Sequence, residues 1–198
     1  MWRGLYRMKT KRSDGIRAVA AELFAKHGYG AVGVADLGEA VGLGRGALYY
    51  HISSKEDLLY DISSHYVQLL IDDGRNIIAR ELDPVERIRL LSRAMIGAVY
   101  NHRAAMTVCF REIHGLSGDR YRNVNQLHQD YQQLWADTVS MGVAQGKFRS
   151  IEKVAIKGLM GMFFYSFLWL NPEGPQTADE IGDIFSDLIL HALVPWEK

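Results

Sequence analysis

Apolar residues recur every three or four positions along most of this 198-residue chain, which is the spacing of one face of an α-helix. Within residues 14–27, for example, Ile16, Ala20, Leu23 and Phe24 form one such stripe. The alternation of apolar and polar residues that marks half-buried strands is missing from the sequence. The pattern therefore predicts an all-α fold of about nine helices.

Capping signals set the expected ends of these helices. Ser13 and Gly28 suit the two ends of the first helix, and Asp83 precedes a proline at the start of the fifth. Ser53–Glu56 and Thr177–Glu180 both have the form of a capping box. Helices are predicted over residues 14–27, 34–41, 45–51, 53–80, 84–100, 104–112, 119–145, 151–170 and 178–192.

Residues 34–58 predict two short helices joined by a tight glycine turn, with a newly capped third helix after them. The middle helix carries Arg45, Tyr49, Tyr50 and His51, whose side chains can hydrogen-bond to bases and phosphates. A helix of barely two turns gains little from burying one face. Its polar and aromatic surface therefore favours a helix-turn-helix that reads DNA.

Charge is unevenly distributed, although the net charge of the whole chain is zero. Residues 1–55 hold nine Lys and Arg against four acidic residues, a balance of +5, so the remainder carries −5. A basic first quarter on an acidic remainder fits a nucleic-acid-binding head on a body with another role. We expect residues 1–58 to form the DNA-binding domain and residues 59–198 to form an effector-binding and dimerisation domain.

The sequence also restricts the cellular setting. A single cysteine, Cys109, excludes an intrachain disulfide and fits a reducing cytoplasm. No secretory h-region follows the early arginines, and the longest apolar stretch, 158–170, is too short to span a bilayer. Met8 is a second candidate start. We expect a cytoplasmic protein with no membrane association.

Three segments together resemble the TetR family of one-component transcriptional regulators. Residues 20–29 are similar to the family's first-helix signature, 34–43 to its second helix and turn, and 46–55 to its recognition helix and the start of the fourth helix. The resemblance implies a ligand-responsive regulator, typically a repressor that leaves a palindromic operator when an effector shifts the fourth helix. It implies double-stranded DNA as partner, no enzymatic activity and no cofactor.

The resemblance also implies roles for individual residues. Arg45 is expected to contact a base, since a guanidinium can hold guanine O6 and N7 together. Tyr49, Tyr50 and His51 are expected to contact phosphates, and Lys55 lies where the family places a phosphate-binding lysine at a helix N-terminus. The expected DNA-binding residues are Lys9, Thr10, Lys11, Arg12, Gly33, Gly44, Arg45, Gly46, Ala47, Tyr49, Tyr50, His51 and Lys55.

Two features modify this expectation. Residues 9–12 are predicted to be a flexible basic arm that follows the DNA backbone or enters a minor groove. Val32, Gly33, Gly44 and Ala47 stand where the family commonly has hydroxyl residues. We therefore expect DNA binding that is weaker, more dependent on the arm and steeply sensitive to salt.

The last two predicted helices are candidates for a homodimer interface. The helix at 151–170 is apolar nearly all round, which is more than one buried face requires, and Gly158 and Gly161 would allow close helix approach. The resemblance implies a four-helix bundle with the symmetry mate. The expected dimerisation residues are Ile156, Met160, Phe164, Phe167, Ile181, Phe185 and Leu188.

Aromatic and methionine side chains on the middle helices suit an adaptable apolar pocket, although each one taken alone is equally compatible with an ordinary core. Arg103, Arg111 and Arg120, with His102 and His114, could serve an anionic group. The C-terminal half is loosely similar to family members that sense acyl-CoA esters, so the expected effector is small and hydrophobic or anionic and amphipathic. The expected ligand-binding residues are Tyr66, Met95, Tyr100, Arg103, Met106, Cys109, Phe110, Arg111, Tyr131, Trp135, Met162, Phe163 and Trp169.

Two alternatives remain open at this point. The missing hydroxyls would also fit a helical scaffold whose head no longer binds DNA. Cys109 could act as a redox sensor, although a lone cysteine on an apolar helix is usually a small buried hydrophobe. The seven histidines show no metal-binding spacing, so no metal site is expected.

Overall fold

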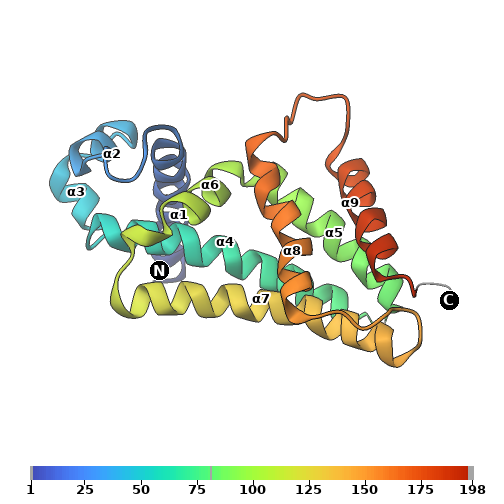
Figure 1. Cartoon of the computed structure of the whole chain (residues 1–198). Coiled ribbons are helices and arrows are strands. Elements are labelled where there is room, and N and C mark those ends of the chain that lie inside the picture. The colour runs from blue at the N-terminus through green and yellow to red at the C-terminus, as the bar shows by residue number, and fades with distance from the viewer. Residues whose placement is uncertain (1, 81, 196–198) are drawn as a thin grey trace. The chain divides into compact units, whose positions relative to one another are not determined.

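The computed structural model describes the backbone of residues 2–80 and 82–195, and within these ranges the side chains from residue 12 onward. The described residues are α-helical with two short 3-10 turns and contain no strand, as the apolar periodicity predicts (Figure 1). The elements are α1 (Trp2–His27), α2 (Val34–Ala40), α3 (Arg45–Tyr49), α4 (Lys55–Ile78), α5 (Pro84–Asn101), α6 (Arg103–Arg111), η1 (Ile113–Gly115), α7 (Gly118–Ala144), α8 (Lys153–Tyr165), η2 (Ser166–Leu168) and α9 (Ala178–Leu193).

Several helix ends follow the chemistry expected from the sequence. Thr177 and Glu180 form a reciprocal capping box, in which each side chain accepts a hydrogen bond from the other residue's backbone N–H, at 3.2 and 2.7 Å. Asp83 accepts a hydrogen bond from the N–H of Val85 at 2.8 Å and so caps α5. Gly28 follows α1 with a φ of +85°, a conformation that glycine adopts without a steric penalty.

Other helix ends differ from the prediction. α1 begins at Trp2 rather than near residue 14, because no proline interrupts the preceding residues, and Ser13 therefore lies inside the helix. For α4 the sequence allows a start at Ser53 or at Ser54, and the structure selects Ser54, whose hydroxyl accepts a hydrogen bond from the N–H of Asp57 at 3.0 Å. α8 is shorter than residues 151–170, since the chain tightens into η2 after Tyr165.

The described residues divide into two compact units, and the divisions fall inside α4 and α7 and beside the start of α6. The head unit consists of residues up to 66 together with residues 104–124. Its core contains both halves of the helix-turn-helix as well as side chains from α1, α4, α6 and α7. Its fully or almost fully buried members include Ile16, Ala20, Phe24, Leu37, Leu48, Leu59, Ile62, Val108 and Val124.

The body unit consists of residues 67–103 and 125–195. Its main packing is between α5 and α9, which lie side by side (Figure 1). Arg93 on α5 and Asp183 on α9 form a two-pronged ion pair, with Nε and Nη2 each donating to one carboxylate oxygen at 2.6 and 2.8 Å. Among the described residues, no helix is both long enough and apolar enough to cross a membrane.

Candidate nucleic-acid interface

The turn between α2 and α3 is held by backbone contacts. The N–H of Leu43 donates to the carbonyl of Gly38 at 2.8 Å, and a Cβ at position 38 would lie only 2.8 Å from the carbonyl oxygen of Leu43. Gly42 has a φ of +65° in this turn. Leu37 and Leu48 are fully buried beneath α2 and α3. The two short helices therefore form one rigid element, and their relative placement depends on glycine at two positions.

The outer surface of α3 carries most of the side chains that sequence analysis assigned to DNA. Arg45, Ala47 and Tyr49 are exposed, and Tyr50, just after α3, is 71% exposed. The guanidinium of Arg45 lies 5.8 Å from the ring centroid of Tyr49. A planar cation beside one exposed phenol ring, with a second exposed phenol next in the sequence, can bind phosphates and base edges. Gly33, Gly44 and Gly46 are exposed as well.

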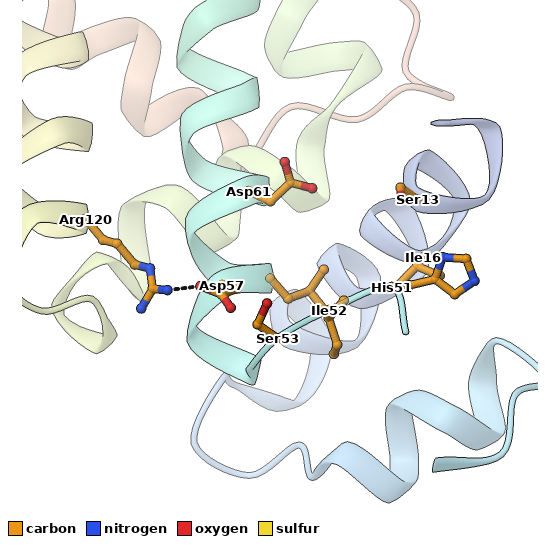
Figure 2. A pocket seen from close by; sticks show the side chains of 9 residues that line it. Ser13, Ile16, His51, Ile52, Ser53, Asp57, Asp61 and Arg120 are labelled. Carbon is orange, nitrogen blue, oxygen red and sulfur yellow. Dashed lines mark hydrogen bonds and ion pairs between the residues drawn. The ribbon is translucent and has the colours of Figure 1, made fainter. Parts of the chain in front are cut away.

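His51 is placed differently from its neighbours. It is half-buried, its ring meets that of Tyr50 edge to face, and its Nδ1 is enclosed without a hydrogen-bond partner among the described residues. It lines a cavity of about 340 Å³ within the head unit, together with Ser13 and Ile16 of α1 and Asp61 of α4 (Figure 2). His51 therefore lines this cavity, and its contact with a phosphate stays a prediction.

Lys55 makes contacts within the protein that the sequence did not predict, and its contact with a phosphate stays a prediction. Its ammonium group donates to the backbone carbonyls of Tyr29 and Val32, at 2.8 and 2.9 Å, and lies 4.3 Å from the ring centroid of Tyr29. The side chain is thus directed into the loop between α1 and α2. The pattern of residue types does not indicate this contact, because the carbonyl acceptors are 23 and 26 residues away in the sequence.

The predicted flexible arm is wrong in its conformation. Residues 9–12 belong to α1 and are helical. Arg12 is exposed on this helix, whereas the side chains of Lys9, Thr10 and Lys11 lie outside the described part of the structure. A basic helical extension follows a phosphate backbone in a fixed direction, which an unfolded arm does not.

An ion-pair network links the first turn of α4 to the start of α7, inside the head unit. Glu56 accepts hydrogen bonds from the N–H and hydroxyl of Ser117, at 2.8 and 2.9 Å, and these bonds hold the pKa of its carboxyl group below the ordinary value. Arg120 binds both Glu56, at 3.2 Å, and Asp57 (Figure 2). Nothing in the sequence pattern indicates these pairs, since their members are about sixty residues apart.

The expected ligand-binding residues are divided between the two units. In the head unit, Tyr66, Met106 and Cys109 are buried, whereas Phe110 and Arg111 are exposed. Burial raises the pKa of the Cys109 thiol to about 12, despite the side chain of Ser63 beside it. Because the thiolate is the reactive form, this position does not favour the redox alternative.

In the body unit, four of the expected ligand-binding residues form a buried group. The hydroxyl of Tyr131 donates to the sulfur of Met95 at 3.4 Å, and the rings of Trp135 and Phe163 are 5.4 Å apart. Burial raises the pKa of Tyr131, so its hydroxyl remains a neutral hydrogen-bonding group.

The remaining ligand candidates of the body unit are nearer the surface. Tyr100 donates to the carbonyl of Pro172 at 2.5 Å, and Nε of Arg103 donates to the carbonyl of Phe167 at 3.0 Å. Met162 is half-buried and Trp169 is exposed. A hollow of about 470 Å³ in this unit is lined by other residues, among them Arg80, Arg93 and Asp179, and by none of the predicted ligand-binding residues.

Six of the exposed large apolar side chains of the body unit lie on α8, on α9, on η2 or at its C-cap. They are Val154, Tyr165, Leu168, Trp169, Ile184 and Leu188. Gly158 and Gly161 of α8 face open space, where a Cβ would meet no atom of the chain within 4 Å. Of the predicted dimerisation residues, Leu188 lies on this exposed surface and Phe185 is half-buried. The structure places the others in the interior of the chain: Ile156, Met160, Phe164, Phe167 and Ile181.

Comparisons with known proteins agree with this architecture. Residues 16–62 match the model of the bacterial regulatory proteins of the tetR family, and residues 81–193 match the tetracyclin repressor-like C-terminal domain. The chain is 28% identical over 188 residues to the HTH-type transcriptional repressor KstR2 of Rhodococcus jostii, an alignment that covers 93% of this chain and 92% of that protein.

Solved structures are also similar. The TetR family transcriptional regulator PfmR from Thermus thermophilus superimposes with a TM-score of 0.83 at 31% identity, covering 89% of this chain and 97% of that one. AibR in complex with isovaleryl coenzyme A and operator DNA has the same fold, with a TM-score of 0.79, 24% identity, and coverage of 93% of this chain and 98% of that one.

Proposed function

Because the chain belongs to the TetR family of bacterial transcriptional regulators, we propose that it represses transcription by binding a palindromic operator as a homodimer and releases the DNA when a small effector binds. It is a DNA-binding, ligand-responsive repressor, and its action requires no chemical step. We further propose that it acts in the cytoplasm, where the operator and the effector are both present.

The exposed surface of α3 is the observation that best supports the proposed DNA-binding function. Arg45, Tyr49 and Tyr50 project from a helix whose opposite side, at Leu48, is fully buried in the core of the head unit. A helix held this rigidly presents its outer side chains in a fixed direction, as entry into a major groove requires. We propose that Arg45 reads a base, that Tyr49 and Tyr50 bind phosphates, and that the backbone of Gly44, Gly46 and Ala47 approaches the DNA closely.

The dimer is supported by the apolar surface of α8 and α9. Four large apolar side chains are exposed on these helices, Val154 and Tyr165 on α8 and Ile184 and Leu188 on α9, and Gly158 and Gly161 face open space. Large exposed apolar surface is typical of a protein–protein interface. We propose that a second copy covers it. Two-fold symmetry would then place two α3 helices about one turn of DNA apart, which matches a palindrome.

For the effector, we propose a hydrophobic or acyl-type compound, with acyl-CoA esters as the first class to test. AibR, which shares the fold, binds isovaleryl coenzyme A. In this chain the cluster of Met95, Tyr131, Trp135 and Phe163 supplies apolar and polarisable surface with one neutral hydroxyl. Such side chains adapt to an acyl group by changing rotamers. α4 has residues in both units, and we propose that it carries the change from body to head.

Fluorescence anisotropy would test this function directly. A duplex that covers the DNA immediately upstream of the gene, and duplexes selected by the protein from a random pool, would be compared with scrambled duplexes of equal length. Saturation at two chains per specific duplex, with release by an acyl-CoA of one chain length and not by free coenzyme A, is expected. Failure to enrich any duplex would instead favour the scaffold alternative.

A further inference from the structure

Lys55 connects two parts of the head unit that are separate in sequence. It lies in the first turn of α4, and its ammonium group reaches the loop that joins α1 to α2. Two of its three N–H donors go to the carbonyls of Tyr29 and Val32, and the charge lies over the Tyr29 ring at 4.3 Å. A cation that binds two carbonyls and an aromatic face has most of its binding capacity engaged inside the protein.

The loop that Lys55 holds leads directly into α2. Val32 is almost fully buried, and Gly33 is the N-cap of α2. Because glycine has no side chain, the N-cap supplies no oxygen to the first turn; the only capping side chain is that of Asp36, which accepts a hydrogen bond from the N–H of Gly33 at 2.7 Å. The start of α2 therefore depends on how the loop before it is held.

Displacement of α2 would be passed on to α3. The turn between the two helices is closed by the Leu43–Gly38 hydrogen bond, and position 38 has no room for a side chain. The two helices consequently move together. The contact made by Lys55 thus fixes the direction in which Arg45 and Tyr49 are presented.

We propose that Lys55 is a positioning residue for operator recognition: it fastens the loop between α1 and α2 to α4 and so orients α3, instead of serving mainly to neutralise a DNA phosphate. This inference rests on the proposed DNA-binding function. Under this proposal, Lys55 helps the protein to distinguish its operator from other DNA, although Lys55 itself contacts no base.

A salt series separates the two roles. A lysine that neutralises a phosphate weakens binding to all duplexes alike when it is removed, and the slope of log affinity against log salt falls by about 0.9. A positioning lysine leaves that slope unchanged, and its removal lowers affinity for the operator more than affinity for other DNA. Removal of a residue that only stabilises the fold changes neither the salt slope nor the ratio of operator to non-operator affinity, when both are measured on the folded fraction of the protein.

The experiment compares Lys55→Met with Lys26→Met, which removes the same charge from an exposed position on α1. Each variant is titrated across a salt series with a duplex that the wild-type protein has selected from a random pool, and with a scrambled duplex. Folded protein is quantified by circular dichroism and thermal melting. For Lys55→Met we expect roughly a tenfold fall in the ratio of operator to scrambled affinity, with an unchanged salt slope. Lys26→Met should match the wild type in both.

Tyr29→Leu provides an independent variant if Lys55→Met does not fold. It removes the ring beneath the ammonium group and leaves every positive charge in place, so it should lower the same ratio at constant slope. Equal weakening on both duplexes with a smaller slope in Lys55→Met would overturn the proposal in favour of a phosphate contact. An unchanged ratio in the folded fraction of both variants would overturn it as well. Failure of the wild type to select any duplex would contradict DNA binding itself.

Discussion

Gly182 of α9 lies against the backbone of Arg93 on α5, so close that a Cβ at position 182 would be 2.7 Å from Cα of Arg93. A methyl group at this point cannot be accommodated by rotation of a side chain, because the atom it meets belongs to the main chain. The α5–α9 packing, and with it the surface of α9, depends on this glycine.

Gly182→Ala should therefore destabilise the protein by about 1–3 kcal/mol, although alanine favours a helix more than glycine does. Denaturant unfolding followed by circular dichroism measures this. Gly97→Ala in α5 is the matched control, since its Cβ would meet no atom within 4 Å and should be neutral or stabilising by up to about 1 kcal/mol. Equal stability of the two variants would mean that α5 and α9 are less tightly packed than described.

The Arg93–Asp183 ion pair makes stability sensitive to acid. The hydrogen bonds from Arg93 lower the pKa of the Asp183 carboxyl group in the folded state below its ordinary value near 3.8. Such a group contributes stability above the unfolded pKa, and this contribution is lost as the pH falls through the folded pKa. Asp183→Asn should flatten the decline of stability below about pH 4, as measured by thermal melting across pH. A decline as steep as that of the wild type would assign the acid sensitivity to other carboxylates, such as Glu56.

Arg45→Ala should weaken operator binding by about 1–3 kcal/mol and relax the preference for one base pair of the site. The reason is that a guanidinium can bind guanine O6 and N7 together, which alanine cannot replace. Anisotropy with the selected operator and its single-base variants measures both effects. If the loss is the same for every sequence, Arg45 contacts only the backbone of the DNA.

If a second copy covers α9 as proposed, Leu188→Asp should convert the dimer into monomers. Leu188 is exposed on α9 together with Ile184, and a carboxylate buried against a second copy would lose its hydration without gaining a partner. Sedimentation velocity over a concentration series measures the change. Tyr121→Asp is the control, because Tyr121 is also an exposed large apolar residue but lies on α7 within the head unit. A monomeric wild type would remove the basis for this interface.

Cys109 should react with thiol reagents only after unfolding. Its side chain is buried and its thiol pKa is raised to about 12, so the thiolate is scarce at neutral pH. Labelling with a chromogenic disulfide should be slow in the native protein and complete within the mixing time in denaturant. Rapid native labelling, or loss of DNA binding after mild oxidation that a reductant reverses, would revive the redox alternative.

Several conclusions were available from the amino-acid order because they depend on short-range physics. The apolar stripe through Ile16 and Phe24, the capping box at Thr177 and the glycine that ends α1 all involve residues within one or two helical turns. The polar surface of α3 could be recognised in the same way. The sequence alone was therefore enough to predict an all-helical chain with a helix-turn-helix near its start.

Other features arise only when distant segments meet. Lys55 was expected to bind a DNA phosphate. In the structure its ammonium group donates hydrogen bonds to the carbonyls of Tyr29 and Val32, which the sequence does not indicate. Helix 153–165 is apolar on several sides, so residue types alone do not show which side faces the interior. In the structure, Ile156 and Met160 are buried, whereas Val154 and Tyr165 are exposed. Tertiary structure decides which side chains are buried and which partners they bind. Both depend on residues that are distant in the sequence but close in space, and the local sequence does not identify these residues.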